Sequence, residues 1–120
     1  TQVAMGQANT TYHEIGIGKS ESGDVAYRWL SQDNIYQKGL CESAEVAITR
    51  EGTKTYYEFK MPWKDIIRPT DTNPVDGQIV GFSFLVNDND GEDRRGWIEY
   101  ASGIGESKNT DLFTYMTFIK

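Results

Sequence analysis

Residues 55–61 read TYYEFKM, and this stretch decides the fold class of the chain. Successive side chains of a β-strand point to opposite faces. Tyr57, Phe59 and Met61 would therefore share one face, and the residues between them would share the other. Such a period of two over seven residues predicts a strand rather than a helix.

Similar runs, which alternate or are rich in β-forming residues, predict six further strands, at residues 13–17, 25–30, 45–49, 78–86, 97–100 and 113–119. Segments rich in Gly, Asn, Asp and Ser separate these runs and indicate turns. The run 78–86 (QIVGFSFLV) predicts one long central strand, in which Gly81 marks a bulge or a close approach. Short strands with turns between them predict an all-β fold, an antiparallel β-sandwich.

Helical signals are confined to residues 62–67, where Pro62 suits a first helical turn and Pro69 stops the helix soon after. We expect at most one short helical turn, with Trp63 packed in the core. The length of 120 residues predicts a single domain, residues 1–120. Residues 1–6 (TQVAMG) have the pattern of a strand in mid-sandwich. We therefore expect a domain truncated at its N-terminus, with an open sheet edge.

Composition limits the ligand. The net charge of −6 argues against nucleic acid, whose binding rests on Lys and Arg. It also disfavours anionic membranes and acidic polysaccharides, so a neutral ligand fits best. No apolar run is long enough for a membrane-spanning helix. Cys41 is the single cysteine, which excludes an intrachain disulfide and predicts a buried, inert thiol.

Three stretches carry a family resemblance: residues 57–63 (YEFKMPW), residues 81–91 (GFSFLVNDNDG), and residues 94–100 (RRGWIEY) followed by 108–113 (KNTDLF). In order and spacing they resemble family 9 carbohydrate-binding modules, within the DOMON-like β-sandwich group. The resemblance covers essentially the whole chain. It implies a jelly-roll-like, non-catalytic, extracellular module that binds plant polysaccharides such as cellulose, xylan or other β-glucans. Other modules of a larger secreted protein would be its neighbours.

The resemblance also implies a sugar site. Tyr100 falls where the family has a stacking Trp, Arg28 falls where an Arg binds sugar hydroxyls, and Gln2 falls on a strand with a polar sugar contact. Trp29 is a further candidate ring, because sugar recognition needs aromatic faces for pyranose C–H groups. Trp97 and Tyr100 should face opposite sides of a strand, so only one of them can line a given surface. The resemblance implies that this one is Tyr100; the alternative is that both rings cover edges of the core. For Arg28, a solvated strand arginine or a surface ion pair is the alternative.

Residues 87–93 (NDNDGED) form the densest group of side-chain oxygens. Calcium binds six to eight oxygens, and loops rich in carboxylates supply them. The resemblance implies structural calcium, and Asp88 and Asp90 are the candidate ligands. The alternative is a solvated loop whose Asn and Asp side chains cap their own backbone.

Two other functions stay open. DOMON-like relatives include haem proteins, for which His13 with Met5, Met61 or Met116 could supply ligands. Alternatively, the domain is a structural or assembly domain that has lost sugar binding and forms homo-oligomers through an open sheet edge. No serine elbow, phosphate loop or metal-hydrolase histidine pair is present, and no carboxylate pair is singled out. We therefore expect no enzymatic activity.

Overall fold

The computed structural model describes residues 13–31, 36–66, 73–89, 94–105 and 109–119. The regular elements in these ranges are β-strands and 3-10 turns, and the paired strands are antiparallel. The predicted all-β, antiparallel fold class is therefore confirmed. The part described contains no helix that could cross a membrane. Its residues cluster into an N-terminal unit, between residues 13 and 73, and a C-terminal unit, between residues 74 and 119.

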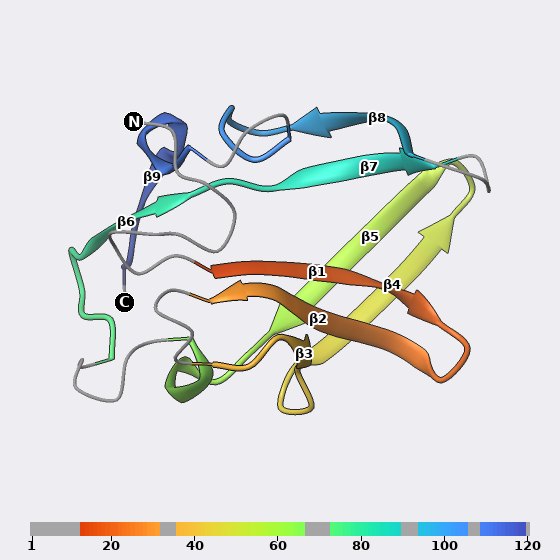
Figure 1. Cartoon of the computed structure of the whole chain (residues 1–120), viewed down its shortest axis with the longest axis horizontal. Coiled ribbons are helices and arrows are strands. Elements are labelled where there is room, and N and C mark those ends of the chain that lie inside the picture. The colour runs from red at the N-terminus through yellow and green to blue at the C-terminus, as the bar shows by residue number, and fades with distance from the viewer. Residues whose placement is uncertain (1–12, 32–35, 67–72, 90–93, 106–108, 120) are drawn as a thin grey trace. The chain divides into compact units, whose positions relative to one another are not determined.

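The N-terminal unit contains a three-stranded sheet and a hairpin (Figure 1). Strands β1 (His13–Ser20), β2 (Gly23–Ser31) and β3 (Gly39–Leu40) form the sheet in that order. Strands β4 (Glu45–Glu51) and β5 (Lys54–Lys60) form the hairpin, and β4 packs against β2 and β1. The hairpin runs obliquely to β1 and β2 in Figure 1.

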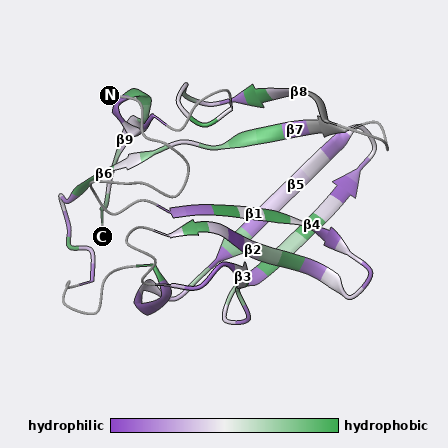
Figure 2. Ribbon diagram, in the orientation of Figure 1, coloured by the Kyte–Doolittle hydropathy of each residue, from purple (hydrophilic) through white to green (hydrophobic). Residues whose placement is uncertain are grey.

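Local sequence explains these elements. Isoleucines alternate with glycines in the middle of β1, and its ends are hydrophilic (Figure 2). Gly52 lies in the β4–β5 turn with φ +60°, a left-handed conformation that glycine adopts without steric cost. Ala26, Ile48 and Cys41 are buried apolar residues of this unit. The thiol of Cys41 is buried and forms no disulfide, as predicted.

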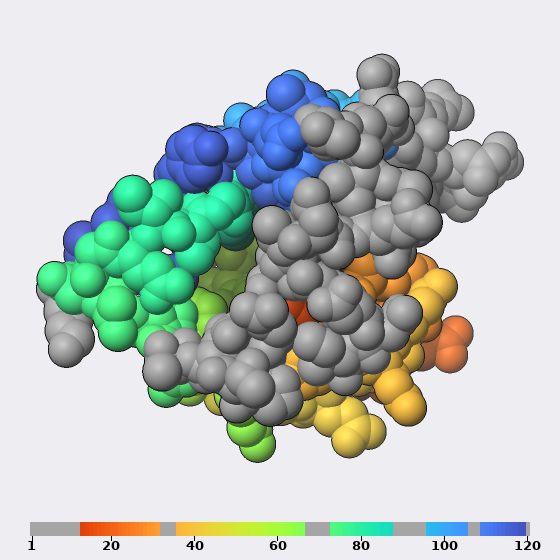
Figure 3. All heavy atoms as spheres, turned by 60° about the vertical axis from the view of Figure 1, so that its left-hand side comes forward, coloured from red at the N-terminus to blue at the C-terminus, as the bar shows by residue number. Residues whose placement is uncertain are grey.

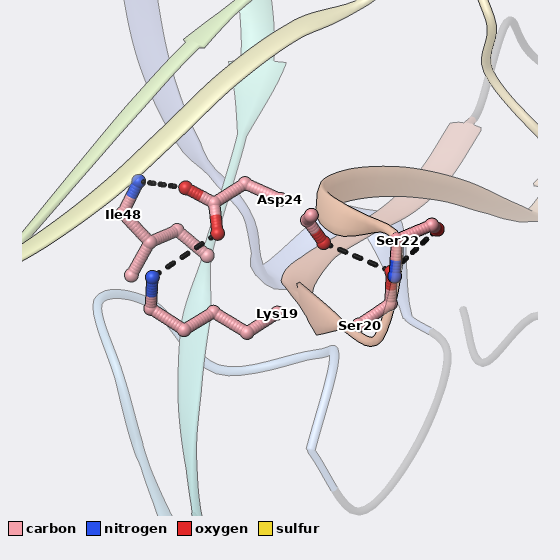
Figure 4. A network of polar contacts seen from close by, with 6 residues as sticks. Lys19, Ser20, Ser22, Asp24 and Ile48 are labelled. Atoms are coloured by element: carbon pink, nitrogen blue, oxygen red, sulfur yellow. Dashed lines mark hydrogen bonds and ion pairs between the residues drawn. The ribbon is translucent and has the colours of Figure 1, made fainter.

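Asp24 ties β2 to β4 (Figure 4). Its Oδ2 accepts a hydrogen bond from the backbone N–H of Ile48 at 2.8 Å, and its Oδ1 accepts one from Nζ of Lys19 at 3.2 Å. Ser20 Oγ accepts from the N–H of Ser22 and donates to the carbonyl of Gly23, which closes the adjoining β1–β2 turn. The Ile48 N–H, and then Lys19, lower the pKa of Asp24.

The C-terminal unit consists of two strand pairs. Strand β6 (Ile79–Phe82) pairs with β9 (Thr114–Thr117), and β7 (Leu85–Asn89) pairs with β8 (Arg94–Glu99). In the space-filling view, residues near β6 (green) adjoin residues near the C-terminus (blue), as this pairing requires (Figure 3).

The prediction of one long strand over residues 78–86 is wrong. The run breaks at Ser83 and Phe84, where the chain changes pairing partners from β9 to β8. Ser83 Oγ donates to the carbonyl of Ala101 at 2.7 Å. Gly81 pairs in regular register, and a Cβ there would meet Phe113 at an ordinary 3.7 Å. It therefore marks neither a bulge nor a close approach.

Two 3-10 turns are described, one more than the sequence predicted. Trp63–Asp65 (η2) is the expected turn after Pro62. Thr110–Leu112 (η3) is the additional one, and Asn109 Oδ1 caps it by accepting from the N–H of Asp111 at 3.1 Å. The side chain of Trp63 is 38% exposed, so the prediction that it fills the core is wrong.

Candidate functional site

Tyr100 directly follows β8 and presents an exposed ring. Its side chain is 62% exposed, and its ring stacks on that of Phe84 with centroids 5.2 Å apart and planes 10° apart. The backbone N–H of Tyr100 donates to the carbonyl of Phe84 at 2.9 Å, which joins the two residues through main chain as well. Phe82 continues the row, 6.0 Å from Phe84. We call Phe82, Phe84 and Tyr100 the aromatic row.

Hydrogen bonds hold the described part of the chain after Tyr100, residues 101–105 and 109. Gly103 accepts a hydrogen bond from the N–H of Asn109 at 2.9 Å, and Gly105 donates to Oε2 of Glu99 at 3.2 Å. Trp97 is half-buried and lies against Gly105 so closely that no side chain would fit there. Trp97 is therefore covered by the loop, whereas the Tyr100 ring is exposed.

Arg28 lies in the N-terminal unit and is 7% exposed. Its Nη2 donates to the backbone carbonyl of Asp65 at 2.5 Å, and its guanidinium carbon lies 4.8 Å from the ring centroid of Tyr36. Its buried Nε finds no hydrogen-bond partner among the described residues. In this conformation Arg28 joins β2 to the η2 turn. Its contact with sugar stays a prediction.

His13 lies beside Arg28, and both contact Tyr36. The ring centroids of His13 and Tyr36 are 5.9 Å apart, and the Tyr36 hydroxyl donates to the carbonyl of Lys64 at 2.5 Å. Burial lowers the pKa of His13, the charge of Arg28 lowers it further, and a hydrogen bond to the backbone of Ile66 opposes both. We call His13, Arg28 and Tyr36, with the backbone of residues 64–66, the polar cluster. No sequence signal indicated Tyr36 or residues 64–66 as its members.

Trp29 lies on the opposite face of β2 from Arg28. The β1–β2 register shifts beside Trp29, and its face is shown by its ring, which lies over Gly16, the partner of Tyr27. Trp29 is 48% exposed, and its ring contacts that of Tyr27, with centroids 4.5 Å apart and planes 47° apart. Nζ of Lys38 lies 5.2 Å from the centre of the Trp29 ring. The structure therefore does not bring Trp29 and Arg28 to one surface. The sequence prediction missed Lys38 as a neighbour of Trp29.

Gln2, Met5 and Asp90 lie outside the described residues. The backbone of Asp88 belongs to β7, opposite Gly96, but its side chain is not among those described. Within the described parts of the chain, no group of three or more His, Cys, Asp or Glu residues could hold a metal ion. Calcium at Asp88 and Asp90 stays a prediction.

Comparison with known families agrees with the sequence resemblance. The model of the family described as "Carbohydrate family 9 binding domain-like" matches residues 11–120, which include all of the described residues. Neither the curated proteins nor the solved structures give a match. Domains of this kind are non-catalytic modules that bind carbohydrate. The chain belongs to the carbohydrate family 9 binding domain-like family.

Proposed function

We propose that the domain binds neutral plant polysaccharide, such as cellulose, xylan or another β-glucan, and stacks a sugar ring on Tyr100. The observation that carries this proposal is the aromatic row, in which an exposed Tyr100 ring lies nearly parallel to Phe84. Carbohydrate binding itself follows from the family. The choice of ligand and of residue is the proposal.

Stacking on Tyr100 has a simple physical basis. One face of a pyranose presents C–H groups, which gain from leaving water against an aromatic ring. Phe84 supports the Tyr100 ring from behind, 5.2 Å away, so little freedom of the side chain is lost on binding. A neutral sugar also avoids the repulsion that the net charge of −6 exerts on anionic polymers.

The biological use of such binding would be to target an enzyme. A single module binds weakly to moderately, but a catalytic domain on the same protein is then held near its substrate at a raised effective concentration. We propose this role, in a secreted or cell-surface protein, on the basis of family membership.

Retention on insoluble cellulose and xylan tests the proposal. Tyr100→Ala should weaken binding about tenfold, because an aromatic contact worth ~1.4 kcal/mol is lost. Tyr115→Ala is the matched control, since Tyr115 is a 77% exposed tyrosine on β9 of the same unit. Binding that is equal in the Tyr100→Ala and Tyr115→Ala variants would overturn the role of Tyr100.

A role in assembly is the second candidate, and β5 favours it. Every residue of this strand is exposed, with Tyr57 at 48% and Phe59 at 43%. Exposed apolar side chains on a strand are typical of surfaces that pair with a partner. The mass of the chain in solution tests this role. A dimer that Phe59→Lys dissociates would support assembly, whereas a monomer at all concentrations would contradict self-association.

A further inference from the structure

We propose a second sugar-stacking surface in the N-terminal unit, formed by Tyr27 and Trp29 with Lys38 beside them. Its ligand is a neutral pyranose unit of the polysaccharide. The inference rests on the proposed function in that the ligand is a polysaccharide, but it does not depend on Tyr100. We call Tyr27, Trp29 and Lys38 the β2 platform.

Glycines on the neighbouring strand make the platform possible. Gly16 lies opposite Tyr27 in the β1–β2 register, and Gly18 lies opposite Val25, so both occupy the face that carries Tyr27 and Trp29. The Trp29 indole extends over Gly16, where a Cβ would come within 2.8 Å of the ring nitrogen. Because β1 offers no side chain at these positions, the indole can lie across the strand.

The rings of Tyr27 and Trp29 form a surface of two inclined planes. Trp29 is 48% exposed, and its ring contacts that of Tyr27 with the two planes 47° apart. On the other side of Tyr27, its partner residue Leu40 is 62% exposed. Amphipathic rings of this kind suit the C–H face of a pyranose, which is apolar but bordered by hydroxyl groups.

The opposite face of β2 already packs against the hairpin. Ala26 and Arg28 are buried there, and Asp24 accepts the Ile48 N–H of β4. Trp29 takes no part in these contacts, because its ring lies over Gly16 on the other face. The exposed rings are therefore not explained by the core of this unit.

Lys38 supplies the polar group that a sugar site needs beside its rings. Its ammonium lies 5.2 Å from the indole centre. Exposed cation–π contacts are weak, so the ammonium can move aside when a sugar stacks. It carries three N–H donors, which can reach sugar hydroxyls at the edge of the ring.

The experiment uses the full chain, labelled with nitrogen-15 and titrated with cellotriose and xylotriose. The indole N–H signal of Trp29, identified by its loss in Trp29→Phe, should shift and saturate. Trp29→Ala should weaken binding at this surface about tenfold, and Lys38→Gln about threefold. Tyr56→Ala removes a similarly exposed ring from β5 and should change nothing. If Trp29→Ala fails to fold, Trp29→Phe, with its smaller ring, should still weaken binding.

The outcomes separate this inference from the proposed function. A saturable Trp29 shift that persists in Tyr100→Ala supports the β2 platform as an independent surface. Signals that respond around Tyr100 but not at Trp29 overturn the platform and leave the role of Tyr100 intact. A response at Trp29 alone overturns the role of Tyr100 and keeps the platform. No response at either surface overturns both.

Discussion

At the scale of residues, His13 and Arg28 share the polar cluster beside the η2 turn. Arg28 is permanently charged and 7% exposed, so a second cation next to it is unfavourable. The pKa of His13 is accordingly lowered, chiefly by burial and then by Arg28. The other groups of the cluster are Tyr36 and the backbone of residues 64–66, and the carboxylate of Asp65 accepts from Ser43 instead. The surroundings of His13 therefore favour its neutral form over its charged form.

A pH dependence of stability follows from His13. Its pKa in the folded state lies below its unfolded value of about 6.5, so the unfolded state binds more protons between the two values. The contribution of His13 to the free energy of unfolding should be complete above about pH 6.5 and should be lost as the pH drops through this window. Urea unfolding at about pH 8 and about pH 5.5 measures the effect. His13→Gln should reduce the difference, and an unchanged difference would contradict the account.

The second prediction at this scale concerns Asp24. Asp24→Ala removes the acceptor of the Ile48 N–H and leaves a donor in a largely buried residue without its partner. The free energy of unfolding should fall. Lys19→Ala is the control, since it removes only the ion pair of a 65% exposed lysine. A loss in Lys19→Ala as large as in Asp24→Ala would show that the ion pair, rather than the tie to β4, stabilises the fold.

At the scale of elements, the strands could be predicted where pairing is local. The β4–β5 hairpin follows from alternation within residues 45–60, because both strands and their turn are adjacent in the sequence. The break at Ser83 could not be predicted in this way. It arises because β6 and β7 pair with different strands, and the Ser83–Ala101 hydrogen bond spans 18 residues. The alternation of side chains within a strand does not indicate which other strand pairs with it.

In the candidate site, too, local features could be predicted from the sequence, whereas tertiary contacts could not. Tyr100 could be identified from the sequence by its place in a family motif, but its stacking on Phe84 depends on the β7–β8 pairing. The burial of Arg28 depends on Asp65, 37 residues away, and no alternation pattern indicates such a contact. Contacts between side chains that lie far apart in the sequence could therefore not be predicted.

The loop after β8 gives a prediction for an element. Gly103 has φ +104°, and a Cβ there would collide with the carbonyl of Asn109. Gly103→Ala should lower stability by about 1–3 kcal/mol and disturb the loop beside Tyr100. Gly96→Ala on β8 is the matched control, because no atom lies within 4 Å of its added Cβ. Thermal unfolding compares them; equal melting temperatures would contradict the strain at Gly103.

At the scale of the whole molecule, one family match over residues 11–120 spans both units. Each unit contributes exposed rings, Tyr100 in one and Trp29 in the other. The excess of 18 Asp and Glu residues over 12 Lys and Arg residues favours a neutral glycan over an anionic one. It is also compatible with the binding of cations.

The prediction for the molecule as a whole concerns its stabilisation by bound calcium. If Asp88 and Asp90 bind it, added calcium should raise the melting temperature, since a ligand at about 100 times its Kd stabilises by about 2.7 kcal/mol. The double substitution of Asp88→Asn and Asp90→Asn should abolish the shift. A melting temperature that calcium leaves unchanged would contradict a structural calcium site.

The most direct test of sugar binding through Tyr100 is calorimetric titration of the chain with xylo- and cello-oligosaccharides, alongside Tyr100→Ala and Tyr115→Ala. The account predicts saturable binding that Tyr100→Ala weakens about tenfold and Tyr115→Ala leaves unchanged. A well-folded chain that binds none of these sugars, or that binds them equally in both variants, would contradict it.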